Sequence, residues 1–336
     1  VPDLEPGDVL VALRACGLCG TDIHKLVTRT ARAGAVLGHE VVATVLATAG
    51  RVVGREGREI LPGARIVTPH HVACGECHYC RGESPTLCAT FREDLLDPGG
   101  FAEIFVVRAR AARDALFEIP DRLDDEAALF LEPAACVVRG IRRSGIANGE
   151  TAVIAGAGST GLLHVLVLRA MLPDVRIHSI DPVADRRKLA LELGADGAWS
   201  PAEATDALRA VTDGRGADRI FDTAGGTAIL EASLEWGRRG STCVLFAHAP
   251  PGDSGAIPLD RFFKEERRIV PSYSGALDDQ ALVWALLVDG RLDPRPLVTS
   301  RVPLSQLAAG VRAAREREAI KVVVVPDATA TTERDR

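Results

Sequence analysis

The sequence has 336 residues, and because domains commonly hold about 150 residues, two domains are expected rather than one. Hydrophobic residues make up 47% of the chain and charged residues 26%, a composition that excludes a mainly disordered, collagen-like or membrane protein. The 40 Lys and Arg residues against 46 Asp and Glu residues give a net charge of −6, which argues against a nucleic-acid partner.

The longest apolar stretch, residues 151–168, is interrupted by glycines and polar residues, so no membrane-spanning segment is predicted. The first residues lack the basic start and the apolar block of a signal peptide. Both observations favour a cytoplasmic location.

The first part of the chain is predicted to form a β-rich domain. Short runs of strand-forming residues recur there among glycines and prolines, at residues 9–13, 41–46, 65–67 and 102–107.

Two segments of this domain carry candidate zinc ligands. Cys19 opens the segment CGTDIH, His39 and Glu40 lie in GHE, and Glu132 precedes a proline. A cysteine, a histidine and an acid can hold zinc while one coordination position stays open to water or substrate. A single Cys or His is more often a packed residue than a ligand, so these residues alone leave the choice open.

Four cysteines within the segment CGECHYCRGESPTLC predict a second metal site, formed by Cys74, Cys77, Cys80 and Cys88. Their spacing is typical of thiolates around one tetrahedral zinc. Because the protein would fill all four positions, this zinc would be structural. The alternatives are two disulfides or buried free thiols, and a reducing compartment disfavours the disulfides.

From residue 151 the pattern changes to apolar runs that alternate with amphipathic segments, which is typical of β-α-β units around a parallel sheet. Strands are predicted at 151–155 and 175–180, and helices at 159–171 and 184–193. Further strands are expected at 219–221, 241–246 and 269–272.

A dinucleotide-binding motif lies between the first strand and the first helix of this region. Gly156, Gly158 and Gly161 form G-x-G-x-x-G around Ser159 and Thr160, a pattern that brings a pyrophosphate to a helix N-terminus.

Asp181, at the end of the next strand, can accept hydrogen bonds from the adenosine ribose and thus favours NAD over NADP. Capping of the following helix is the alternative role for Asp181. Arg186 and Arg187 leave some NADP use open.

The last part of the chain does not extend the nucleotide-type sheet. Helices are predicted at 277–288 and 304–315, followed by a strand at 322–325. We expect this segment to rejoin the first domain, and residues 328–336 to form a low-complexity tail.

These motifs together resemble the zinc-dependent medium-chain alcohol and polyol dehydrogenases over nearly the whole chain. The matching pieces are CGTDIH, GHE, the four-cysteine lobe, GGFAE at 99–103, LEPAAC, and GAGSTG followed by Asp181. The resemblance implies an α/β fold, with a Rossmann doubly wound parallel sheet domain at 133–275. It also implies a discontinuous GroES-like β-rich catalytic domain at 1–132 and 276–336, with the structural-zinc lobe at about 70–90.

The resemblance also implies roles for individual residues. Cys19 and His39 correspond to ligands of the catalytic zinc, and Glu40 to an acid next to the metal that reaches it in some states. Glu132 corresponds to the third-ligand position, where the alcohol dehydrogenase branch has a cysteine and the sorbitol branch a glutamate. Thr21 and His24 match a proton relay, Asp22 an acid that orients His39, and Arg186 a contact to the coenzyme ribose. His70 and His71 occupy a stretch that often lines the substrate pocket, although histidines in an exposed loop are an equal alternative.

The implied function is hydride transfer between a secondary alcohol, such as a polyol, sugar or cyclitol, and NAD(P), which interconverts alcohol and ketone. Two zinc ions per chain, a small hydroxyl substrate and a homo-oligomer, either dimer or tetramer, belong to the same expectation. One alternative is a zinc-free NADPH-dependent quinone or enone reductase of the same fold, which Cys19, His39 and Glu132 argue against. The other is a non-catalytic protein that binds NAD and zinc, which the relay pair Thr21 and His24 argues against.

Overall fold

The computed structural model describes residues 3–249 and 252–328, so residues 329–336 of the predicted tail lie outside it. Contacts divide the chain into two compact units, Val1–Ala135 with Gly275–Arg336 and Cys136–Ser274. The boundary between them falls within helix α5 (Leu131–Ser144).

The first unit is built on a mostly antiparallel sheet in the order β13-β14-β1-β2-β3-β6, with β5 also on β1 and β4 on β5. Only β13 and β14 pair in parallel among its described strands. The C-terminal segment therefore joins the N-terminal one, because β14 pairs with β1. The strands are β1 (Val9–Gly17), β2 (Glu40–Thr48), β3 (Arg65–Thr68), β4 (Leu96–Asp97), β5 (Ile104–Val107), β6 (Phe117–Glu118), β13 (Val298–Pro303) and β14 (Lys321–Val325).

Alternating residues of β1 account for its place in this sheet. Val9, Val11 and Leu13 are buried in the core of the unit, together with Val41 and Val45 of β2. Burial of each such side chain contributes about 1.5–3 kcal/mol, so the period of two fixes the register.

Short helices surround this sheet. The first, α1, begins directly after β1 because Cys19 and Asp22 cap it: the Cys19 Sγ accepts the Thr21 N–H at 3.4 Å, and the Asp22 carboxylate accepts the Cys19 N–H at 3.1 Å. The helices are α1 (Gly20–Val27), α2 (His78–Arg81), α3 (Ala109–Asp114), α4 (Asp125–Ala128), α11 (Leu277–Val288) and α12 (Leu307–Arg315), with short 3₁₀ turns at Pro85–Leu87, Arg295–Leu297 and Leu304–Gln306.

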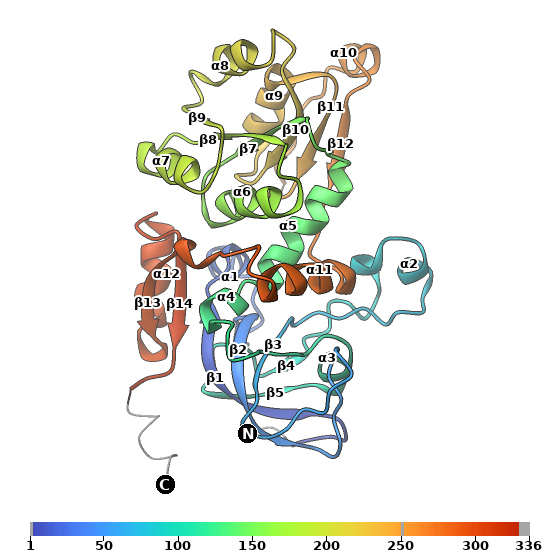
Figure 1. Ribbon diagram of the computed structural model, residues 1–336, viewed down its shortest axis with the longest axis vertical. Helices are drawn as coiled ribbons and strands as arrows, with labels where there is room; N and C mark the ends of the chain where they lie inside the picture. The colour runs from blue at the N-terminus through green and yellow to red at the C-terminus, as the bar shows by residue number, and fades with distance from the viewer. Residues whose placement is uncertain (1–2, 250–251, 329–336) are drawn as a thin grey trace. The chain divides into compact units, whose positions relative to one another are not determined.

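The second unit contains a six-stranded parallel sheet in the order β12-β11-β10-β7-β8-β9. Helices lie on both faces of it, α6 and α7 on one and α8 and α9 on the other (Figure 1). The order reverses between β7 and β10, and ligands of doubly wound sheets bind at such a switch point. The elements are β7 (Thr151–Ala155), α6 (Ser159–Met171), β8 (Arg176–Ile180), α7 (Ala184–Glu192), β9 (Gly197–Trp199), α8 (Ala204–Val211), β10 (Ala217–Asp222), α9 (Thr227–Trp236), β11 (Gly237–Leu245), α10 (Leu259–Lys264) and β12 (Arg268–Pro271).

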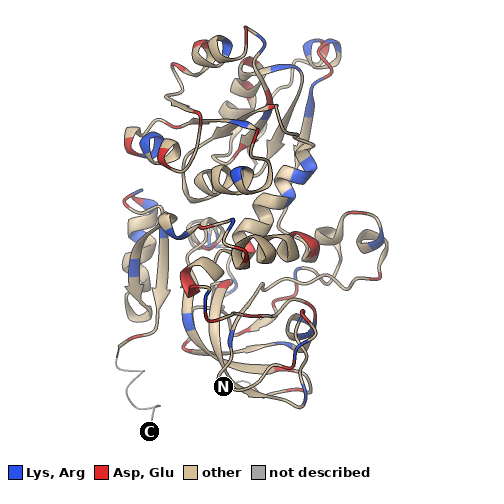
Figure 2. Ribbon diagram, in the orientation of Figure 1, with Lys and Arg blue, Asp and Glu red and all other residues tan. Residues whose placement is uncertain are grey.

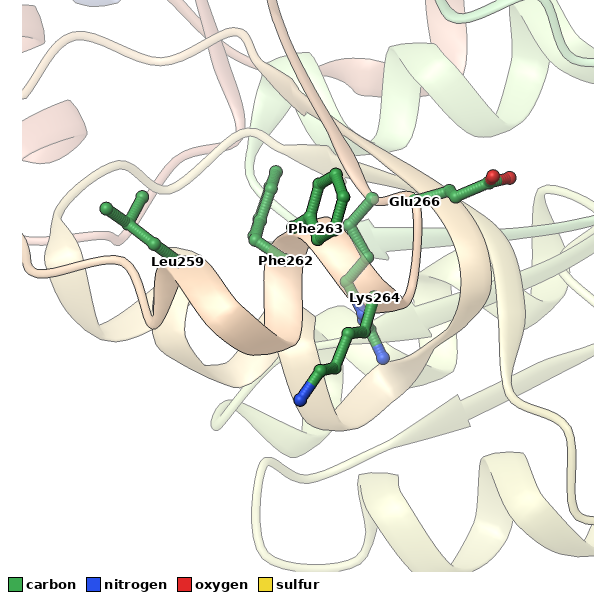
Figure 3. Close-up of a pocket in the computed structure, with 6 residues that line it drawn as sticks. Leu259, Phe262, Phe263, Lys264 and Glu266 are labelled. Carbon is green, nitrogen blue, oxygen red and sulfur yellow. The ribbon is translucent and has the colours of Figure 1, made fainter.

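The most exposed large apolar side chains of the described residues lie on one helix. Lys and Arg are interspersed with Asp and Glu along both units (Figure 2). On α10, Leu259 is 76% exposed and Phe263 is 83% exposed, and both line a surface hollow with Phe262, Lys264 and Glu266 (Figure 3). Over residues 3–249 and 252–328, no helix has the length and apolar character that crossing a bilayer requires.

Two buried histidines of the second unit make its stability depend on pH. Burial lowers the pKa of His164 in α6 and of His178 in β8 to about 4. The unfolded chain, with histidine pKa values of about 6.5, binds more protons than the folded one at acidic pH. The stability is therefore fully present above about pH 6.5 and declines as the pH falls toward about 4.

We expect the free energy of unfolding to fall by about 2 kcal/mol per ring between about pH 7.5 and about pH 5, as measured by urea titration. In His178→Phe, a ring without a titratable nitrogen would keep the stacking on Trp199, which has a centroid distance of 4.7 Å. This variant should lose about 2 kcal/mol of the pH dependence, the share of one ring. The same dependence in variant and wild type would contradict the assignment.

Candidate active site and metal centres

The first candidate site lies where β1 ends and β2 begins. Gly17, at the end of β1, pairs with Glu40 at the start of β2, and Cys19 and His39 flank this pair in sequence. As a result, one ligand atom each from Cys19, His39 and Glu40 lies within 4.8 Å of the others. A thiolate, an imidazole and a carboxylate at such separations fit a zinc site with an open coordination position.

Asp22 holds His39 in one orientation. Its Oδ1 lies 3.3 Å from the Nδ1 of His39 and accepts the Gly38 N–H at 3.4 Å. Burial alone would raise the pKa of Asp22, but the hydrogen bond and charge of His39 hold that pKa below its ordinary value. With Nδ1 engaged by Asp22, the Nε2 of His39 is the nitrogen available to a metal.

Sequence reasoning missed Lys321, the first residue of β14. The residue is 3% exposed, its side chain forms an ion pair with Glu40, and its Nζ lies 5.6 Å from the ring centre of Phe130. Burial alone would lower the pKa of Lys321, but the charge of Glu40 raises it above the ordinary value. A signal for this contact exists in the sequence, since a lysine opens the otherwise apolar run KVVVV.

Gly17 makes room for this ion pair. A Cβ atom at position 17 would lie 1.9 Å from the Glu40 Oε2 and 3.0 Å from the Cε of Lys321. Any larger residue there would displace the Glu40 carboxylate.

The other predicted residues of this site lie on two helices. Thr21 and His24 are half-buried on α1, three residues apart and thus on one face of the helix. Glu132, the second residue of α5, is outside the group of ligand atoms formed by Cys19, His39 and Glu40. It lies close enough to raise the pKa of Lys321.

A row of aromatic rings leads away from His39. The ring centre of His70 lies 4.4 Å from that of His39 and 3.6 Å from that of His71, and His71 lies 5.3 Å from Phe91. Burial lowers the pKa of His70 well below its ordinary value and that of His71 to about 3. His70 is 9% exposed, and its buried Nδ1 has no hydrogen-bond partner among the described residues.

The four cysteines of the lobe converge. Their sulfur atoms all lie within 4.8 Å of one another, with Cys77 to Cys80 at 3.5 Å and Cys74 to Cys80 at 3.8 Å. Four zinc–sulfur bonds of about 2.3 Å at tetrahedral angles separate the sulfurs by about 3.8 Å, whereas a disulfide bond is about 2.05 Å long. The geometry therefore fits one metal ion and not two disulfides.

The surroundings of Cys88, the last cysteine of the lobe, favour its thiolate form. Burial alone would raise the pKa of Cys88, but the N–H of Cys74 at 3.5 Å and the hydroxyl of Thr90 at 3.3 Å lower it to about 6. Thiolates are the form that binds metals.

The glycine motif of the second unit forms a turn at the switch point of the parallel sheet. Gly156 adopts a φ of +101°, and a Cβ on Gly161 would lie 1.8 Å from the carbonyl oxygen of Gly156, so helix and turn pack without space for a side chain. At Gly158 a Cβ would meet nothing within 4 Å. This open side, next to an α6 N-terminus without a side-chain cap, fits a pyrophosphate.

Asp181 follows β8 and contacts this turn. Its carboxylate accepts the N–H of Ala157 at 2.7 Å and the N–H of Val183 at 2.8 Å. Each carboxylate oxygen has a further lone pair for a ribose hydroxyl. Ser159 and Thr160 begin α6, and Arg186 lies half-buried on α7.

Two family models match the chain. One, described as the alcohol dehydrogenase GroES-like domain, matches residues 5–121, and the other, described as zinc-binding dehydrogenase, matches residues 159–289.

Similar proteins extend over almost the same length. D-altritol 5-dehydrogenase from Agrobacterium fabrum is 32% identical, with 91% of this chain and 88% of the relative covered. Sorbitol dehydrogenase from Bacillus subtilis is 26% identical, with 97% and 92% covered. The solved structure of a zinc-binding dehydrogenase from Sinorhizobium meliloti bound to NADP is 29% identical, with a TM-score of 0.83 and coverage of 97% and 94%.

Proposed function

Because the chain belongs to the zinc-dependent medium-chain dehydrogenase family, it is an alcohol/ketone oxidoreductase, and we propose that it oxidises a secondary alcohol group of a hydroxyl-rich substrate with NAD⁺. Its parallel sheet is the Rossmann part of this family's fold, and its antiparallel sheet the GroES-like part. The family uses zinc, a nicotinamide coenzyme and a small-molecule substrate. The convergence of Cys19, His39 and Glu40 is the observation that carries the proposal.

In this proposal Cys19, His39 and Glu40 hold the catalytic zinc. Glu132, whose charge raises the pKa of Lys321, is the alternative carboxylate ligand to Glu40. When bound, zinc supplies Lewis acidity at the alcohol oxygen and the nicotinamide accepts the hydride. Asp22 keeps the imidazole of His39 in its binding orientation. Lys321 balances the negative charge that Glu40 adds to the site.

In this proposal, side chains of helix α1 relay the proton of the alcohol to solvent. The Thr21 hydroxyl can accept that proton while it donates its own, and the imidazole of His24, one helical turn further on, can relay a proton to solvent. Both side chains are half-buried, so they reach from the site toward water.

Reduction of NAD⁺ by the purified protein tests the function. The panel contains simple secondary alcohols, polyols, sugars, aminocyclitols and amino alcohols, each with and without a zinc chelator. We expect chelator-sensitive turnover confined to hydroxyl-rich compounds. Turnover of quinones or enones with NADPH, unaffected by the chelator, would instead establish the zinc-free reductase.

We infer that the coenzyme is NAD, because the Asp181 carboxylate at the glycine turn would repel a 2′-phosphate. Asp181→Ala is expected to lower the ratio of kcat/KM for NAD⁺ to that for NADP⁺ by about 10- to 100-fold. The control is Asp222→Ala, which removes the carboxylate that caps the N–H groups after the neighbouring strand β10. An unchanged ratio in Asp181→Ala would mean that Asp181 supports the glycine turn and does not select the coenzyme.

We propose two zinc ions per chain, one at each of the two groups of candidate ligands. For the domain limits we propose 1–132 with 276–336 for the catalytic domain and 133–275 for the coenzyme domain, which the two compact units support. The buried thiols of Cys16 and Cys243, which form no disulfide, favour the reducing cytoplasm.

We also propose a homo-oligomer, either dimer or tetramer. The exposed Leu259 and Phe263 on α10 precede β12, which is the edge strand of the parallel sheet. Apolar side chains next to an unpaired strand edge are typical of a covered surface. Sedimentation equilibrium would give a multiple of the 35.6 kDa chain mass, and a monomer would contradict the proposal.

A further inference from the structure

Thr223 follows β10 directly, at the switch point of the parallel sheet. Strands β10 and β7 lie side by side there (Figure 1). The Thr223 Oγ1 lies 2.9 Å from the carbonyl oxygen of Ala155, the last residue of β7, and 3.0 Å from that of Gly156. The hydroxyl of Thr223 therefore joins the end of β10 to the glycine turn that precedes α6.

Of the two carbonyl groups, that of Gly156 depends more on this hydroxyl. A hydroxyl has one hydrogen to donate, and the Ala155 oxygen already accepts the backbone N–H of Thr223 at 3.0 Å. Gly156 lies after β7 and before α6, so its carbonyl is outside the hydrogen bonds of both elements. We therefore assign the hydroxyl hydrogen of Thr223 to the oxygen of Gly156.

The same hydroxyl packs against the third glycine of the motif. A Cβ on Gly161 would lie 2.9 Å from the Thr223 Oγ1 and 1.8 Å from the Gly156 oxygen. A Cβ on Gly156 would lie 3.0 Å from the Thr223 Oγ1. Atoms packed this closely leave little room for displacement. The direction of the Gly156 carbonyl, and with it the path of the turn into α6, therefore depends on Thr223.

The path of this turn matters because of the ligand that the motif binds. A pyrophosphate is held by backbone N–H groups at a helix N-terminus, and the open side of Gly158 lies next to that of α6. Groups that are already in place bind a ligand without the entropy loss of being ordered, so preorganisation contributes to affinity.

We infer that Thr223 is a positioning residue for the coenzyme, whose hydroxyl holds the Gly156 carbonyl so that the glycine turn and the α6 N-terminus are preorganised for the pyrophosphate. This inference rests on the coenzyme site of the proposed function and adds to it a residue outside G-x-G-x-x-G. Loss of the hydroxyl should weaken coenzyme binding and leave hydride transfer from the bound complex nearly unchanged.

Binding of NADH to the zinc-loaded protein, measured by isothermal titration calorimetry, tests the inference. In Thr223→Val the Kd for NADH is expected to rise about tenfold, while kcat at saturating coenzyme changes less than about threefold. Thr223→Ser keeps the hydroxyl and should bind NADH within about threefold of the wild type. Thr223→Ala also removes the hydroxyl and replaces the valine variant if that variant does not fold.

Thr212→Val is the matched control. The Thr212 hydroxyl donates to the Leu208 carbonyl at 2.5 Å and accepts the Gly216 N–H at 2.9 Å, so it supports a turn before β10 and not after it. This variant should lose stability but bind NADH as the wild type does. An unchanged Kd in Thr223→Val or Thr223→Ala, or the same rise in Thr212→Val, would overturn the inference.

Two fragments of the coenzyme show which contact is weakened, because ADP-ribose contains the pyrophosphate and adenosine does not. Thr223→Val should weaken the binding of ADP-ribose about tenfold and that of adenosine less than about twofold. Equal losses for both fragments would overturn the inference. A wild type that binds NADH but oxidises no alcohol would refute the proposed function, and a tenfold loss of NADH affinity in Thr223→Val would still support the role of Thr223.

Discussion

Cys19→Ser is expected to remove about one zinc per chain and to lower kcat/KM at least about 1000-fold, because Lewis-acid stabilisation contributes several kcal/mol to such reactions. A serine hydroxyl is a poor replacement for a thiolate ligand of zinc. The fold should persist, since an open site contributes less to folding than a closed one. Metal analysis and steady-state kinetics measure the two effects.

Cys16→Ser is the control for this prediction. Cys16 is fully buried on β1, three residues before Cys19, and is not a member of either ligand group. The same change of sulfur to oxygen there should lower the melting temperature but leave zinc content and the activity per folded molecule within a few-fold. Full turnover by Cys19→Ser would refute the catalytic zinc site.

Cys80→Ser is expected to release the other zinc and to lower the melting temperature by about 10 °C or more. The lobe has little else to stabilise it, because α2 has no buried residue and the buried cluster there consists of Ala73, Cys88 and Phe91. So small a core cannot offset the entropy of an ordered loop. Calorimetry and metal analysis measure the change, and limited proteolysis should cut between about residues 70 and 95.

Cys243→Ser makes the same substitution at a buried cysteine of β11 in the other unit. It should cost about 1–3 kcal/mol of stability without loss of metal. If Cys80→Ser lost a zinc but melted at the wild-type temperature, the lobe metal would not be structural.

The parts of the fold that follow a local pattern could be predicted from the sequence. The strand at 151–155 and the helices at 159–171 and 277–288 occur with the predicted bounds, because each is an apolar or amphipathic run with clear ends. Helix α1 was missed because its start depends on the capping by Cys19 and Asp22, residues whose polarity suggested a site and not an element. Strands β4 and β6 have two residues each and thus no period to detect.

The same distinction holds for the sites. The four cysteines and the three glycines each lie within one short segment, so their spacing alone indicates which of them lie close together. The four sulfur atoms lie within 4.8 Å of one another. The ion pair between Lys321 and Glu40 joins the two ends of the chain, and no local pattern reports such a contact. The unpaired nitrogen of His70 is a property of packing and is equally hidden from the sequence.

Because Lys321 lies late in the chain, its position also determines the order in which parts of the fold can form during synthesis. The four lobe cysteines lie close together in the chain, from Cys74 to Cys88, so the lobe proposed to bind metal can form while later residues are still being added. The counter-charge for Glu40 arrives only when β14 has been made and has paired with β1, after the whole coenzyme unit has been translated. Because domains fold as units during synthesis, we expect the lobe to be able to form well before Glu40 gains its counter-charge from Lys321.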